Sequence, residues 1–182
     1  MARGRPSKRQ HIIDIAIPLF AALGYQGTSI DQVVQEAAVS KPTVYSNFPT
    51  KQALWCAALD TLYQQAKQMK FSSKSDCTWQ QRVDYWLLWM TAEHHLAVYR
   101  VMMGERHKMT GDAEELFREF DGYFRQQLLQ LQHSNDAFAL LVDSFCFQGL
   151  VNLPLMAQPA ATREQLLKQI DSISRFLPQE VN

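Results

Sequence analysis

A group of polar residues between positions 40 and 51 has the side-chain types that contact nucleic acid. Hydroxyl and amide groups can form hydrogen bonds with base edges, and ammonium groups can neutralise phosphates. The residues of this kind are Lys41, Thr43, Tyr45, Ser46, Asn47 and Lys51. A short helix that presents its first two turns to the major groove would bring most of these groups to the bases.

Two short helices joined by a tight turn are predicted to position these residues. Ser29 begins a capping box that starts the first helix, and Ser40 caps the second, which spans about 41–48. Val44 and Phe48 are four residues apart in the second helix and therefore share the face that packs on the core. The pattern predicts a helix-turn-helix whose second helix enters a DNA groove.

Longer helices are predicted on both sides of this motif. The first covers about residues 7–23, and Gly24 is expected to end it as a C′ glycine. Pro18 lies inside this helix and is expected to bend it. A connecting helix is expected over about 50–70, after the motif, and residues 1–6 form a basic arm before the first helix.

The remainder of the chain is also predicted to be helical. Apolar residues recur at helical spacing almost throughout, and 47% of the 182 residues are hydrophobic. This favours an all-α protein of about nine helices. Beyond the connecting helix, five more are expected over about 79–95, 97–108, 112–132, 135–157 and 162–177.

The N-terminal third of the chain, over about residues 7–60, resembles the DNA-binding domain of TetR/AcrR-family regulators. The residues that carry the resemblance are Ile12, Ala16, Leu19, Phe20, Gly24, Tyr25, Thr28, Ser29 and Ile30, followed by Val39, Ser40, Lys41, Pro42, Thr43, Val44, Tyr45, Phe48, Lys51 and Leu54. The chain departs from the family pattern at Pro18 and at Ala38, where glycine is usual. A left-handed conformation at Ala38 would strain the turn by about 1–2 kcal/mol.

The resemblance implies a division of the chain and a mode of action. Residues 1–52 would form the helix-turn-helix DNA-binding domain, and residues 53–182 a ligand-binding and dimerisation domain. Two copies would pair through their last two helices and bind a near-palindromic, double-stranded DNA operator. The chain is then expected to be a transcription regulator, and most simply a repressor that a small hydrophobic or aromatic effector releases. An activator or a ligand-independent regulator of the same fold stays open.

The resemblance also implies which residues contact DNA. Thr28 and Ser29 would touch the DNA backbone, Lys51 would clamp a phosphate, and the arm residues Arg3 and Arg5 would enter the minor groove. Those that would line the major groove are Lys41, Pro42, Thr43, Tyr45, Ser46 and Asn47, with Tyr45 most often on a phosphate. Single residues also fit structural roles, such as Tyr45 in the core or Lys51 at a helix start, but together they favour DNA contact.

Two further sets of residues are candidates for effector binding and for dimerisation. Soft, flat and polar side chains suited to an effector pocket are Trp86, Trp89, Met90, His94, Tyr99, Met103, His107, Phe120, Phe124, Phe145, Gln148 and Asn152. Many of these are equally explained as core. An apolar stripe on the last helix supplies the dimerisation candidates Leu166, Ile170, Ile173, Phe176 and Leu177.

Charge and cysteine content narrow the function classes. Residues 1–51 hold six lysines and arginines against three acidic residues, although the whole chain is neutral. A basic head suits contact with a polyanion, whereas an architectural DNA binder usually carries a stronger positive balance. The three cysteines form no paired motif, which favours a reducing, cytoplasmic location. The sequence gives no sign of a membrane partner.

Catalysis and metal binding have no support in the sequence. There is no glycine-rich phosphate loop and no nucleophile motif, so a helical enzyme is a remote alternative. His94, His95 and His107 do not follow zinc-ligand spacing, and adjacent helical residues point about 100° apart. We therefore expect no metal and no cofactor.

Overall fold

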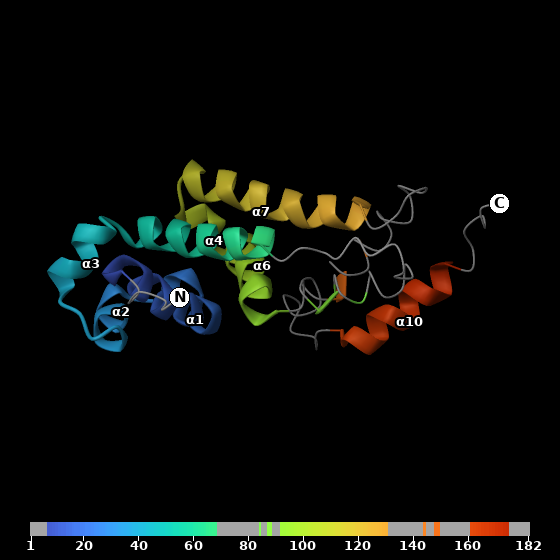
Figure 1. Ribbon diagram of the computed structural model, residues 1–182, viewed down its shortest axis with the longest axis horizontal. Coiled ribbons are helices and arrows are strands. Elements are labelled where there is room, and N and C mark those ends of the chain that lie inside the picture. The colour runs from blue at the N-terminus through green and yellow to red at the C-terminus, as the bar shows by residue number, and fades with distance from the viewer. Residues whose placement is uncertain are drawn as a thin grey trace, which may run out of the picture. The chain divides into compact units, whose positions relative to one another are not determined.

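The computed structural model describes residues 7–68, 84, 87–88, 92–130, 144, 148–149 and 161–174. Side chains are described up to residue 126 in the range 92–130 and up to residue 172 in the range 161–174. Every regular element in these ranges is helical, which confirms the all-α class. The elements are α1 (Lys8–Gly27), α2 (Ile30–Glu36), α3 (Lys41–Asn47), α4 (Lys51–Gln68), α6 (Glu93–Glu105), the 3₁₀ helix η1 (Arg106–Lys108), α7 (Gly111–Gln130) and α10 (Arg163–Ser174) (Figure 1).

The chain forms two compact units. The first comprises residues 1–69 and 93–120, and the second comprises residues 70–92 and 121–182. The helix-turn-helix therefore shares a unit with α4, with α6 and with the first half of α7. The predicted domain boundary after residue 52 falls inside this unit and stays a prediction.

The core of the first unit lies where α1 packs on α4 and α6. Three aromatic side chains form its centre: the ring of Phe20 lies 5.1 Å from that of Trp55 and 6.2 Å from that of Tyr25. Trp55 is buried, and its indole N–H has no hydrogen-bond partner among the described residues. These edge and stacked ring contacts are part of the packing of α1 on α4.

Regular helical geometry in α1 ends at Gly24, as predicted. Gly24 has φ 75° and ψ −179°, a conformation that only glycine adopts readily, and residues 25–27 form a further turn beyond it. Pro18 lies on the exposed side of α1, and the backbone keeps helical dihedral angles there. The interruption of this helix is thus at Gly24.

The capping predicted for the helix-turn-helix is present. Ser29 Oγ accepts from the backbone N–H of Gln32 at 3.1 Å, and the Gln32 side chain accepts from the N–H of Ser29 at 2.7 Å. Ser40 Oγ accepts from the N–H of Thr43 at 3.3 Å at the start of α3. In the turn between the two helices Ala38 has φ 51°, so the left-handed conformation considered from the sequence is confirmed.

Helix α6 packs on the first half of α7 within the same unit. The Tyr99 ring lies 5.4 Å from Phe117, and the His95 ring lies 5.8 Å from Phe120. The predicted break between residues 95 and 97 is wrong, because α6 begins at Glu93. The helices predicted over 79–95 and 135–157 otherwise lie largely outside the described residues.

In the second unit, α10 buries Leu166 and Ile170. Leu166 lies close to Gly149, where an added Cβ would come within 3.0 Å of the leucine side chain. Arg163, in the first turn of α10, forms an ion pair with Asp84. These contacts attach α10 to earlier parts of its own chain.

Candidate nucleic-acid interface

Helix α3 has one buried face and one exposed face. Val44 and Phe48 are almost completely buried, as predicted from their spacing. Lys41, Pro42 and Ser46 are exposed, and Tyr45 leaves 43% of its surface exposed. An aromatic side chain exposed to this extent is not a core residue, so the alternative of a core role for Tyr45 is excluded.

Several polar groups of α3 are occupied within the helix itself. The Thr43 and Ser40 hydroxyl oxygens lie 2.7 Å apart. The Asn47 amide donates to the Thr43 carbonyl at 2.8 Å, and Ser46 Oγ donates to the same carbonyl at 3.0 Å. A base that binds Asn47 or Ser46 must therefore exchange these hydrogen bonds for new ones.

The first residue of α3 is paired with an acid on α2. Lys41 Nζ lies 2.7 Å from Asp31 Oδ1, and both side chains are largely exposed. The hydrogen bond to Asp31 and the charge of its carboxylate raise the pKa of Lys41 above its ordinary value. Lys41 is therefore cationic at neutral pH, but its charge is partly compensated.

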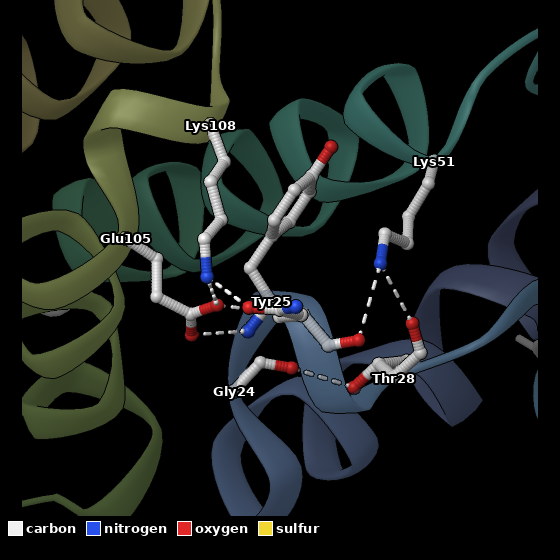
Figure 2. Close-up of polar contacts among 7 residues, drawn as sticks. Gly24, Tyr25, Thr28, Lys51, Glu105 and Lys108 are labelled. Carbon is white, nitrogen blue, oxygen red and sulfur yellow. Dashed lines mark hydrogen bonds and ion pairs between the residues drawn. The ribbon is translucent and has the colours of Figure 1, made fainter.

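Lys51, at the start of α4, reaches back to the end of α1 (Figure 2). Its Nζ donates to the carbonyl of Thr28 at 3.0 Å and to that of Gln26 at 3.4 Å, and it lies 4.6 Å from the centre of the Tyr25 ring. A cation is favourable beside the carbonyls at a helix C-terminus. An ammonium has three protons, so one remains for a phosphate.

Thr28 has a structural position, which corrects the expectation of a surface contact. Its side chain is buried, with 1% exposed, and Oγ1 donates to the carbonyl of Gly24 at 2.8 Å (Figure 2). The same carbonyl also accepts from the backbone N–H of Thr28 at 3.3 Å, so Thr28 caps the end of α1 with both groups. Ser29, the next residue, is exposed.

Glu105, at the end of α6, binds the same end of α1 and was not foreseen from the sequence. Its carboxylate accepts from the backbone N–H groups of Tyr25 at 2.9 Å and Gln26 at 2.7 Å (Figure 2). Lys108 lies 3.8 Å from this carboxylate and donates to the Gln26 side chain. An added Cβ at Gly24 would lie 2.6 Å from Glu105 Oε1, so the close approach requires glycine.

A second contact joins the same regions. Thr110, just before α7, donates its backbone N–H to Gln52 Oε1 at 3.0 Å, and the two side chains are also hydrogen-bonded. Gln52 follows Lys51 in the first turn of α4. The junction of α1 and α4 is thus fixed both by Lys51 and by residues that follow α6.

The start of α1 adds a cation beside α3 that the sequence did not single out. Arg9 is exposed, and its guanidinium lies 4.7 Å above the ring of Phe48 at the end of α3. A cation–π contact of this kind orients the guanidinium and leaves its positive charge available to a phosphate. The arm residues Arg3 and Arg5 lie outside the described residues.

The effector-pocket candidates divide into three groups. Tyr99, Phe120 and Phe124 are buried, and the Tyr99 and Phe120 rings pack 6.0 Å apart as part of the core. His94, Met103, His107 and Gln148 are exposed. The remaining candidates, Trp86, Trp89, Met90, Phe145 and Asn152, lie outside the described residues.

The dimerisation candidates on α10 are only partly accessible. Leu166 and Ile170 are buried within the single chain, with 0% and 1% exposed. A side chain already buried in its own chain adds no area to an interface, so these two serve the core of their unit. Ile173 is placed only by its backbone, and Phe176 and Leu177 lie outside the described residues.

The described residues contain neither a cluster of metal ligands nor a membrane-spanning helix. Among them no three histidine, cysteine or acidic side chains come together as metal ligands would. No helix within those ranges has both the length and the apolar character that a membrane crossing requires.

The capped α2–α3 pair with an exposed second helix has the geometry of a helix-turn-helix, a class of motif that binds DNA. Residues 12–58 match the sequence profile of the family described as bacterial regulatory proteins, tetR family. Over this segment the chain is similar to the TetR family.

Curated relatives match over about a third of the chain. The HTH-type transcriptional regulator RutR of Escherichia coli K12 is 34% identical over 58 residues, which are 32% of this chain and 27% of RutR. The HTH-type transcriptional repressor ComR of the same strain is 38% identical over 61 residues, 32% of this chain and 29% of ComR. The chain thus matches less than a third of the length of these relatives.

Solved structures resemble the chain over almost its whole length. A TetR-family transcriptional regulator from Mesorhizobium loti has a TM-score of 0.68 at 22% identity, covering 93% of this chain and 95% of the other. A transcriptional regulator from Saccharomonospora viridis in complex with choline has a TM-score of 0.72 at 14% identity, with coverages of 92% and 95%. These likenesses establish the fold.

Proposed function

We propose that the chain is a sequence-specific DNA-binding transcription regulator, in which α3 enters the major groove. The observation that carries the proposal is the exposed face of α3, formed by Lys41, Pro42, Tyr45 and Ser46, on a helix held in place by the buried Val44. Polar and cationic groups on the first two turns of such a helix are those that reach base edges.

Phosphate contacts would flank this helix on both sides. Ser29 lies exposed at the start of α2, Lys51 keeps one ammonium proton free at the start of α4, and Arg9 is exposed beside α3. Arg3 and Arg5 are proposed to enter the minor groove ahead of α1. Contacts of this kind fix the register of the protein on DNA, while α3 selects the sequence.

We further propose that the regulator is a homodimer on a near-palindromic operator. A two-fold axis would place two copies of α3 about 34–36 Å apart, one helical turn of DNA. A repressor is the favoured sign of regulation, since ComR is described as a repressor. An activator with the same fold remains the second candidate. Because the proposed partner is chromosomal DNA, we also propose a cytoplasmic location.

A small-molecule effector is proposed to act through the second half of the chain. The neighbour from Saccharomonospora viridis was solved with choline bound, which supports a small ligand for a protein of this fold. The dimer would have two conformations, one that fits the operator and one that does not. An effector that binds the second conformation more tightly would weaken DNA binding by the difference between its two affinities. Helix α4 is the natural connection, because it begins beside α3 and packs on α1 and α6.

Selection of bound fragments from random and genomic DNA tests the DNA-binding proposal. The wild-type protein should prefer the recovered sequence over random DNA by about 10³-fold or more in competition. Glu114→Ala, on the exposed surface of α7, is a control that should retain this preference. Equal affinity for recovered and random sequences would contradict the proposal.

Titration of a panel of hydrophobic, aromatic and quaternary-ammonium compounds tests the effector proposal. Operator affinity is measured with and without each compound, and thermal stability reports binding independently. A compound that raises the melting temperature and weakens operator binding supports the proposal. Compounds that bind without changing operator affinity would contradict it.

A further inference from the structure

An acidic side chain lies on the surface that is proposed to meet a polyanion. Asp31, the second residue of α2, is 72% exposed and lies 2.7 Å from Nζ of Lys41, the first residue of α3, which is 51% exposed. Ion pairs this exposed contribute little to folding stability. When α3 binds DNA as proposed, the Asp31 carboxylate also repels the nearby phosphates. Neither folding stability nor phosphate attraction therefore explains an acidic residue at this position, and a role in binding specificity would.

We propose that Asp31 is a specificity-determining residue that holds Lys41 away from phosphates and keeps it available to base edges. The inference rests on the proposed function. An ammonium has three protons, and Asp31 takes one of them, which leaves two for acceptors in the major groove. A phosphate that binds Lys41 must first displace the carboxylate and then remain beside it.

The consequence differs between random DNA and the operator. Binding to random DNA depends almost entirely on phosphate neutralisation, so a cation withheld from phosphates weakens it directly. At the operator, Lys41 contributes through a base and its pairing with Asp31 persists. Asp31 therefore lowers non-specific affinity more than specific affinity and widens the ratio between them.

Salt dependence of binding to random-sequence DNA tests the inference without knowledge of the operator. In Asp31→Asn, Lys41 becomes free to neutralise one more phosphate, and the slope of log affinity against log salt should steepen by about 0.9. The gain in affinity over wild type should then be about 3.5-fold larger at 50 mM than at 200 mM salt. The preference for the selected fragments should fall.

Three further variants separate this mechanism from a general change of charge. Glu36→Gln removes one negative charge from the other end of α2, five residues away and so on another side of the helix, and should leave the slope unchanged. In the Lys41→Gln background, Asp31→Asn should no longer steepen the slope. Asp31→Ser repeats the test with a residue well tolerated in a first turn, and melting temperatures confirm that each variant is folded.

The outcomes distinguish failure of this inference from failure of the proposed function. A wild-type slope in Asp31→Asn and Asp31→Ser, or an equal change in Glu36→Gln, would overturn the role of Asp31. If the wild-type protein binds selected and random DNA with equal affinity, the proposed function is overturned instead.

Discussion

Replacing Gly24 with alanine should destabilise the first unit in two separable ways. The added Cβ meets Glu105 Oε1 at 2.6 Å, far inside contact distance. The backbone at φ 75° and ψ −179° is also unfavourable for any residue with a side chain. Gly24→Ala thus strains its own backbone and displaces the carboxylate that binds Tyr25 and Gln26.

The size of the effect follows from these two contributions. Backbone strain of this kind costs about 1–3 kcal/mol, and the reduced freedom of alanine in the unfolded chain returns about 0.4–1 kcal/mol. Displacing the half-buried Glu105 from two backbone N–H groups costs roughly a further 1.5–3 kcal/mol, the range for a hydrogen bond to a charged group. We expect a total loss of about 3 kcal/mol in the free energy of unfolding.

Urea unfolding of a double-mutant cycle measures both contributions. Gly24→Ala, Glu105→Ala and the double variant are compared with wild type at constant m-value. Glu105→Ala already removes the steric conflict, so Gly24→Ala should cost about 1–3 kcal/mol less in that background. A loss below 1 kcal/mol in Gly24→Ala, or purely additive effects, would refute the reasoning.

Three further predictions have definite expected outcomes. Ala38→Gly should raise the free energy of unfolding by roughly 0.5–1 kcal/mol, because relief of 1–2 kcal/mol of left-handed strain exceeds the added entropy of the unfolded chain; an unchanged urea midpoint would contradict this. Ser29→Ala should cost about 1 kcal/mol, since it breaks the capping box, with the exposed Ser46→Ala as a control whose unfolding should change by less than 0.5 kcal/mol. Tyr45→Ala should weaken binding to every DNA sequence, whereas Asn47→Ala should alter base preference, as measured by repeated selection; equal losses on all sequences for both would show that their roles are misassigned.

Local features of the DNA-binding domain were predictable because they depend on neighbours in the sequence. The end of regular helix at Gly24, the capping box at Ser29 and the two faces of α3 each follow from residues within one or two turns. Helical periodicity sets which side of α3 is buried. These determinants lie close together in the sequence, so a single sequence is enough to locate them.

Contacts between distant residues were not predictable in the same way. Glu105 lies 80 residues from Tyr25, and nothing in its own surroundings marks it as a ligand for backbone N–H groups. Thr28 matched a surface position in the family pattern but is buried, and both its backbone N–H and its hydroxyl donate to the carbonyl of Gly24. The start of α6 at Glu93 was missed because apolar periodicity locates helix ends poorly where no capping residue stands.

Site-specific photo-cross-linking tests most directly whether α3 is the element that contacts DNA. A photoreactive residue is placed at Ser46, on the exposed face of α3, or at Glu114, on the exposed face of α7. Irradiation with the selected DNA fragment should cross-link the protein labelled at position 46, at bases in the centre of each half-site, and should leave the protein labelled at 114 free. Cross-linking at 114 but not at 46 would contradict the assignment of α3 to the DNA groove.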